Sequence, residues 1–118
     1  MNRARLVKFF SDWHIIVPIS GVIFLLSISW IYALVAFSAI PDRIVLHVNT
    51  YGEIDILGTH GEIYGILGAW TVFILLDIYI AYALYVRKPL WAQIFLYGVV
   101  PIALLSLLFI KTLVSLNA

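Results

Sequence analysis

The sequence predicts an all-α integral membrane protein with three transmembrane helices and a structured extracytoplasmic loop between the first two. The composition is the first observation: of the 118 residues, 64% are hydrophobic and only 11% are charged, whereas about a quarter of the residues of a soluble domain are charged. The second is three apolar runs, each longer than the roughly 20 residues with which a helix crosses about 30 Å of hydrocarbon. The third is a polar segment between the first two runs. We therefore predict a single membrane domain over residues 1–118.

Local signals set the bounds of the predicted elements. Pro41 ends the first helix, because the residue before a proline avoids the helical region. Thr59 and Glu62 have the spacing of a capping box, which predicts that the second helix begins near His60. The expected elements are helices at about 14–40, 60–87 and 90–116, with an outer loop over 41–59.

The basic residues predict the orientation of the spans. Five of the seven lie before the first span or just after the second, and they are Arg3, Arg5, Lys8, Arg87 and Lys88. The positive-inside rule then places the N-terminus in the cytoplasm and the outer loop and C-terminus outside a cell (inner or plasma) membrane. The first apolar run is about twice the 7–15 residues of a signal-peptide core, so we expect an uncleaved helix.

The outer loop has the composition of a small β-hairpin. Two β-rich stretches, 44–48 and 54–57, flank Asn49-Thr-Tyr-Gly52, and asparagine and glycine suit the positive φ of a tight turn. Side chains alternate along a strand, so we expect His47 and Asp55 to lie on one face of the hairpin.

The polar side chains of the loop have two interpretations. In the first, His47, Asn49, Glu53 and Asp55 form an external binding site for a cationic peptide, a lipid headgroup or a metal ion. In the second, they stabilise the loop: Asn49 closes the turn and Asp55 accepts hydrogen bonds from loop N–H groups. A metal is the weakest of the ligands, because the chain has no cysteine and lacks the spacings of zinc and EF-hand sites. We predict neither a metal site nor a cofactor.

The loop also contains a spaced pattern of residues, and these are Ile40, Pro41, Ile44, His47, Asn49, Gly52, Asp55 and Gly58, with an acid at Glu53. This pattern resembles the loop of the SdpI-like bacterial membrane proteins that carry the domain of unknown function DUF1648, which reads approximately Leu-Pro-x-x-Ile-Pro-x-His-x-Asn-x-x-Gly-x-x-Asp-x-Trp-Gly. The chain departs from the pattern at Val45, Ile54, Leu57 and His60. Because the family includes an immunity protein against a secreted antimicrobial peptide, the resemblance implies an immunity or signalling role and an extracellular peptide as partner.

Two charged residues, Asp77 and Lys111, lie inside predicted spans. On insertion scales, an acid inside a span raises the free energy of membrane insertion by about 2.5–3.5 kcal/mol. This cost makes Asp77 a functional candidate. The two residues are expected at levels that differ by about 13 Å, so we predict no ion pair and expect Lys111 to extend outward. We expect Asp77 to contact Ser20, Ser27 or Tyr97 as a clamp between helices. The alternatives are a proton relay and a contact with a basic residue of a partner.

Small residues recur every four positions at the start of the second predicted helix. Gly61, Gly65 and Ala69 form this face, and Gly68 lies beside it. Such a face lets another helix approach closely. We expect it to pack against the first or third helix of the same chain, with a second protomer as the alternative.

The sequence predicts no enzyme, because no catalytic constellation is present, and the net charge of +1 gives no indication of nucleic-acid binding. We expect a small membrane protein, embedded in the lipid bilayer, whose outer loop recognises an extracellular peptide or another ligand. The alternative is a structural or accessory subunit that uses the small-residue face and Asp77 in a homo-oligomer or a larger membrane complex. Proton-coupled transport through Asp77 ranks third, because a relay needs a chain of titratable groups.

Overall fold

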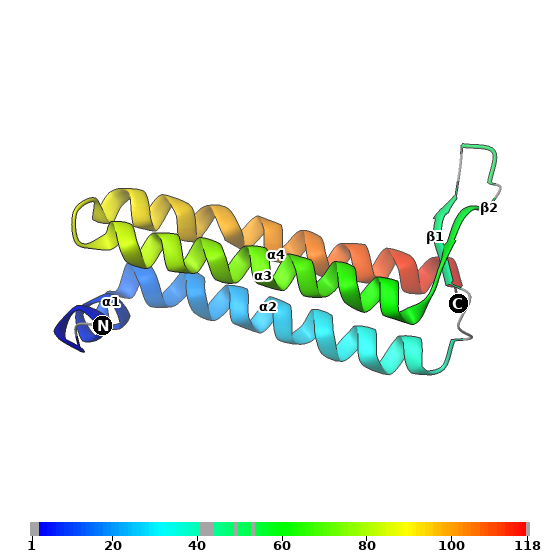
Figure 1. Cartoon of the computed structure of the whole chain (residues 1–118), viewed down its shortest axis with the longest axis horizontal. Helices are drawn as coiled ribbons and strands as arrows, with labels where there is room; N and C mark the ends of the chain where they lie inside the picture. The colour runs from blue at the N-terminus through cyan, green and yellow to red at the C-terminus, as the bar shows by residue number, and fades with distance from the viewer. Residues whose placement is uncertain (1–2, 41–43, 49, 53, 118) are drawn as a thin grey trace.

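Three long helices, one short helix and a two-stranded hairpin make up the part of the chain that the structure describes (Figure 1). The computed structural model describes residues 3–40, 44–48, 50–52 and 54–117, with the backbone alone for 44–48 and 54–57. The elements are α1 (Arg3–Ser11), α2 (Trp13–Ser38), β1 (Ile44–Val48), β2 (Ile54–Gly58), α3 (His60–Tyr85) and α4 (Pro89–Asn117). The three long helices begin and end within two residues of the predicted bounds, and α1 is an additional helix in the basic N-terminal segment.

The helices α2, α3 and α4 run side by side along the long axis of a molecule that measures 53 × 27 × 20 Å (Figure 1). Each is long and apolar enough to cross a membrane, so the chain is a multi-pass membrane protein by length and composition. The central helix of the packing is α4, which contacts both of the others extensively, whereas α2 and α3 touch each other little. Many large apolar side chains on the outer faces are exposed, such as Phe24, Ile31, Leu75 and Leu105. These are the faces that a bilayer would cover.

Buried apolar side chains fill the space between the helices in three clusters along the bundle, centred on Phe9 and Ile15, on Val22 and Ile74, and on Phe37. Each pair of long helices is joined by a hydrogen bond from a side chain, either to another side chain or to a backbone oxygen. Ser29 Oγ and Ser106 Oγ lie 3.2 Å apart between α2 and α4, Trp30 Nε1 donates to Thr71 Oγ1 at 3.0 Å between α2 and α3, and Trp70 Nε1 donates to Ile102 O at 3.0 Å between α3 and α4. Polar contacts in apolar surroundings favour one alignment of neighbouring helices.

Side-chain caps determine where two of the long helices start. Asp12 precedes α2, and its Oδ1 accepts a hydrogen bond from the backbone N–H of His14 at 3.0 Å. Thr59 precedes α3, and its Oγ1 accepts from the backbone N–H of Glu62 at 3.3 Å, which is the threonine half of the predicted capping box. Each cap satisfies an N–H group that has no partner inside its helix.

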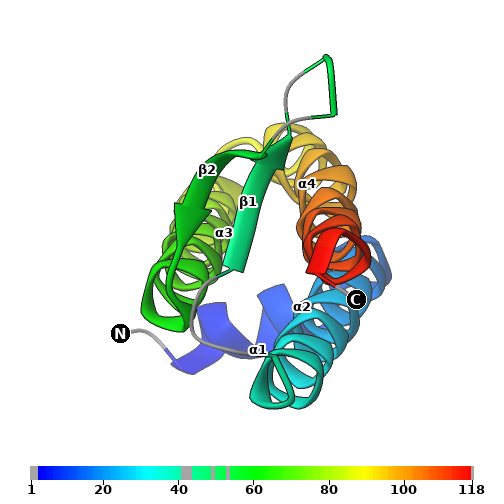
Figure 2. The same ribbon diagram turned by 90° about the vertical axis from the view of Figure 1, so that its right-hand side faces the viewer.

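The strands β1 and β2 pair antiparallel in the segment where the sequence predicts a hairpin. Gly52 follows the turn residues Thr50 and Tyr51 with a φ of 79°, a conformation that glycine adopts without strain. Figure 2 shows the strands lying across one end of the bundle, where β1 contacts α4. Because a hairpin alone is marginally stable in water, this contact with a helix end supports it.

The two ends of the molecule are different. One end holds α1 and the turn between α3 and α4, and we call it the α1 end; the other holds the hairpin and the C-terminus, and we call it the hairpin end (Figure 1). Consecutive long helices run in opposite directions, so the connection between α2 and α3, which contains the hairpin, lies at one end and the turn between α3 and α4 lies at the other.

Candidate functional site

The hairpin end contains two of the four residues that the sequence predicts as a binding site, His47 on β1 and Asp55 on β2. The register places His47 opposite Ile56 and Val48 opposite Ile54, and it shifts on both sides of His47. Asn49 and Glu53 lie outside the described residues, as do the side chains of His47 and Asp55. The predicted shared face of His47 and Asp55 therefore stays a prediction, while the pairing brings the backbones of their strands together.

The turn of the hairpin is exposed at each of its described residues. Tyr51 is 88% exposed, and Thr50 and Gly52 beside it are exposed as well. The sequence predicted Tyr51 only as a turn residue and not as a candidate for binding. An aromatic residue at a tight bend of a polar loop is the signal that could have identified it. Each strand also has an edge with no strand partner in the described part of the chain. Such edges pair readily with an extended peptide, because its backbone supplies the missing hydrogen bonds.

His60 lies at the base of the hairpin as the first residue of α3. Its ring centroid is 6.4 Å from that of Phe37 and 6.5 Å from that of Tyr64. His60, one of the four positions at which the loop departs from the DUF1648 pattern that it resembles, is thus half-buried against aromatic rings of α2 and α3. This packing connects the hairpin to the helices.

Asp77 lies half-buried on α3, beside a cavity of about 290 Å³ between α3 and α4. The described side chains that line this cavity with Asp77 are all non-titratable, and they are Trp91, Ile94, Phe95, Gly98, Val99 and Ile102. Asp77 Oδ2 is buried and has no hydrogen-bond partner among the described residues. The cavity thus supplies no second group for a proton relay.

The predicted partners of Asp77 do not reach it. Ser20, Ser27 and Tyr97 are all exposed on outward faces, so the expected clamp with one of them is wrong. Two of these residues lie on α2, which has little contact with α3, and this explains the error. Lys111 is also exposed, and within the described residues it forms no ion pair with Asp77.

The small-residue face of α3 points away from the bundle. Gly61, Gly65 and Ala69 are exposed, and a Cβ added at Gly65 would meet no atom within 4 Å. The buried residues of α3 include Ile63, Leu67 and Ile74, which lie on the opposite side of the helix by the 100° rotation per residue. The expectation that this face packs against α2 or α4 is therefore wrong. Contact with another molecule stays a prediction.

The α1 end contains a constellation that the sequence did not reveal. Arg5 Nη2 donates to the carbonyl oxygens of Tyr82 at 3.2 Å and Ala83 at 3.0 Å, in the last turn of α3. The Arg5 guanidinium also lies 4.8 Å from the centroid of the Tyr82 ring. A helix leaves its last carbonyl groups without partners and carries a partial negative charge at that end. Arg5 donates hydrogen bonds to two of these carbonyl groups and places its positive charge beside the negative helix end. Arg5 thus links α1 to the end of α3.

A second link connects the start of α2 to the end of α3. The Tyr85 hydroxyl donates to Asp12 Oδ2 at 2.6 Å, while the other carboxylate oxygen caps α2. The hydrogen bond from Tyr85 holds the pKa of the Asp12 carboxyl below its ordinary value, because it stabilises the ionised form. Asp12 is therefore a charged group with both oxygens occupied.

The comparisons with known proteins add no relative. The chain matches no family model, no curated protein and no solved structure.

Proposed function

We propose that this chain is a cell-membrane protein of three spans whose α1 end faces the cytoplasm and whose hairpin end faces outward. The support is the distribution of charge. The basic residues Arg3, Arg5, Lys8, Arg87 and Lys88 flank the spans at the α1 end. Basic residues next to a span favour the cytoplasmic side.

The proposed function is recognition of an extracellular peptide by the hairpin. A single observation carries it: a paired hairpin extends beyond the spans with an exposed turn and with strand edges that are free in the described chain. The resemblance of the loop to SdpI-like DUF1648 proteins supports the same role and suggests that the peptide is a secreted antimicrobial one. His47, Asn49, Glu53 and Asp55 are the proposed ligand-binding residues, and the two acids suit a cationic peptide.

Survival of cells that express the protein tests this proposal. Cells are exposed to a panel of secreted cationic antimicrobial peptides, and the wild-type protein is expected to protect against at least one of them. The combined variant His47→Ala, Asn49→Ala and Asp55→Ala is expected to lose protection while its membrane level and thermal stability stay unchanged. Thr50→Ala is the control, because it alters an exposed turn residue outside the polar set. Full protection by the triple variant contradicts the proposal.

The second candidate is an accessory subunit that packs against another membrane helix through the small-residue face of α3. The outward position of Gly61, Gly65 and Ala69 favours it, because close approach of two helices requires small residues at their contact. Gly65→Leu is expected to shift the protein toward monomer in light-scattering measurements in detergent. Gly21→Leu on α2 is the matched control, since a Cβ there also meets no atom within 4 Å. An unchanged distribution for Gly65→Leu argues against this candidate.

A further inference from the structure

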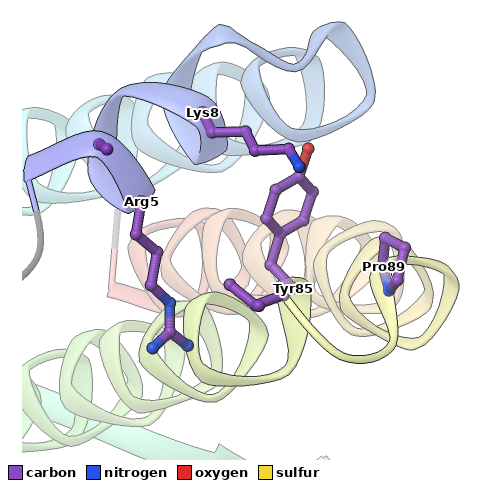
Figure 3. A pocket seen from close by; sticks show the side chains of 6 residues that line it. Arg5, Lys8, Tyr85 and Pro89 are labelled. Atoms are coloured by element: carbon purple, nitrogen blue, oxygen red, sulfur yellow. The ribbon is translucent and has the colours of Figure 1, made fainter.

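Two cavities flank Arg5 at the α1 end. The first, of about 530 Å³, is lined by Arg5, Lys8, Tyr85 and Pro89 among others (Figure 3). Figure 3 shows Arg5 extending from α1 toward α3, and Lys8 extending from α1 toward the hydroxyl end of Tyr85. The second cavity, of about 670 Å³, is lined by Ala83, Leu84, Val86, Arg87 and Lys88 together with Arg5. Arg5 and Val86 belong to both, so the two cavities meet at these residues.

Within the part of the chain that the structure describes, the basic side chains around these cavities lack an anionic partner. Asp12 is the acidic residue nearest to Arg5 and Lys8 in the sequence. Both of its carboxylate oxygens already accept hydrogen bonds, from Tyr85 and from the N–H of His14. No carboxylate in the described chain forms an ion pair with Arg5, Lys8, Arg87 or Lys88. The result is a hollow with an excess of positive charge.

Arg5 is held in place without its charge being neutralised. Its Nη2 donates to two backbone carbonyls and its ring contact is with Tyr82. Its Nε is buried and has no hydrogen-bond partner among the described residues. Carbonyl dipoles and an aromatic face compensate a guanidinium only partly, because neither carries a net negative charge. An anion beside Arg5 would neutralise the remaining positive charge of its guanidinium.

The cavities lie where the spans end. The exposed residues Leu90 and Trp91 begin α4 next to Pro89, and exposed Val86 follows α3. Tryptophan at the end of a span marks the level of the lipid headgroups. An anion bound beside Lys8 and Arg87 would therefore have apolar protein surface on its membrane side, which suits a molecule with a charged head and acyl chains.

We propose that the hollow around Arg5 binds the phosphate of an anionic glycerophospholipid. Arg5, Lys8, Arg87 and Lys88 surround the headgroup, and the acyl chains extend along the exposed apolar side of α4 near Leu90. Basic pockets between spans on the cytoplasmic side suit such headgroups. The site rests on the proposed membrane placement and is independent of peptide recognition by the hairpin.

Native mass spectrometry of the purified full chain tests the site. The protein, in a neutral detergent, is titrated with phosphatidylglycerol, with phosphatidylcholine and with inorganic phosphate. The expected result is one retained phosphatidylglycerol per chain, little retained phosphatidylcholine and no displacement of the lipid by millimolar phosphate. Lys8→Gln is expected to weaken phosphatidylglycerol retention about fivefold, the effect of one basic residue near an anionic headgroup.

Arg3→Gln is the matched control, because Arg3 lies on the same helix and carries the same charge but lines neither cavity. Retention by Arg3→Gln is expected to equal that of the wild type. Equal losses in the two variants would show diffuse attraction and overturn the site. Equal retention of phosphatidylcholine, or displacement by phosphate, would also overturn it. Loss of lipid by Lys8→Gln with intact peptide protection would separate this site from the function of the hairpin.

Discussion

Asp12 shows how one side chain connects two helices that are distant in the sequence. It caps α2 with one carboxylate oxygen and accepts the Tyr85 hydroxyl of α3 with the other. Its place before the first span was visible in the sequence, but its partner was not. The two residues are 73 positions apart, and local patterns carry no information about such a pair. Arg5 and its carbonyl partners on α3 escaped prediction for the same reason.

Replacing Tyr85 by phenylalanine is expected to destabilise the protein at neutral pH by about 1 kcal/mol. Hydrogen bonds to charged groups contribute about 1.5–3 kcal/mol, and partial exposure of Asp12 to solvent reduces this value. The pKa of folded Asp12 is lowered, so its contribution is present above the unfolded pKa and is lost as the pH falls through the folded pKa. The difference between wild type and variant should therefore shrink in acid.

Thermal unfolding in detergent micelles at pH 7 and pH 3 measures this dependence. Tyr79→Phe is the control, because Tyr79 is exposed on the same helix. A stability difference for Tyr85→Phe that is equal at both pH values would argue against an ionised Asp12 as the partner.

At the scale of the elements, the sequence predicted helix bounds well and helix contacts poorly. The bounds follow from local features such as the Thr59 cap and the length of the apolar runs. Contacts depend on which face of a helix turns inward. In an apolar span every face is hydrophobic, so the pattern that identifies the buried side of a soluble helix is weak. This explains why Gly65 and Ala69, expected inside the bundle, lie outside.

The contact of α2 with α4 depends on two small buried side chains, Ser29 and Ser106. Ser106→Leu is expected to destabilise the protein by about 1–3 kcal/mol, because a larger side chain in a packed contact forces the helices apart. Thermal unfolding in micelles measures the loss, with Ser115→Leu on an exposed position of α4 as the control. Equal stability of the Ser106 variant and the control would show that the two helices do not meet as described.

At the scale of the whole molecule, the chain has two chemically distinct ends joined by an apolar bundle. The α1 end collects basic side chains, and the hairpin end contains the exposed turn at Tyr51. Composition and the order of the apolar runs predicted this division, because three consecutive spans place alternate connections on opposite sides. The proposed functions assume the orientation inferred from the charges, with lipid binding proposed at the inner end and peptide recognition proposed at the outer end.

Cysteine accessibility in intact cells tests that arrangement most directly. Because the sequence contains no cysteine, an introduced cysteine is the only thiol of the protein that the reagent can label. Thr50→Cys places a thiol in the hairpin turn, and Val86→Cys places one at the α1 end without removing a basic residue. With a membrane-impermeant maleimide, we expect Thr50→Cys to be labelled in intact cells and Val86→Cys to be labelled only after permeabilisation. The reverse pattern, or equal labelling of both in intact cells, would contradict the account.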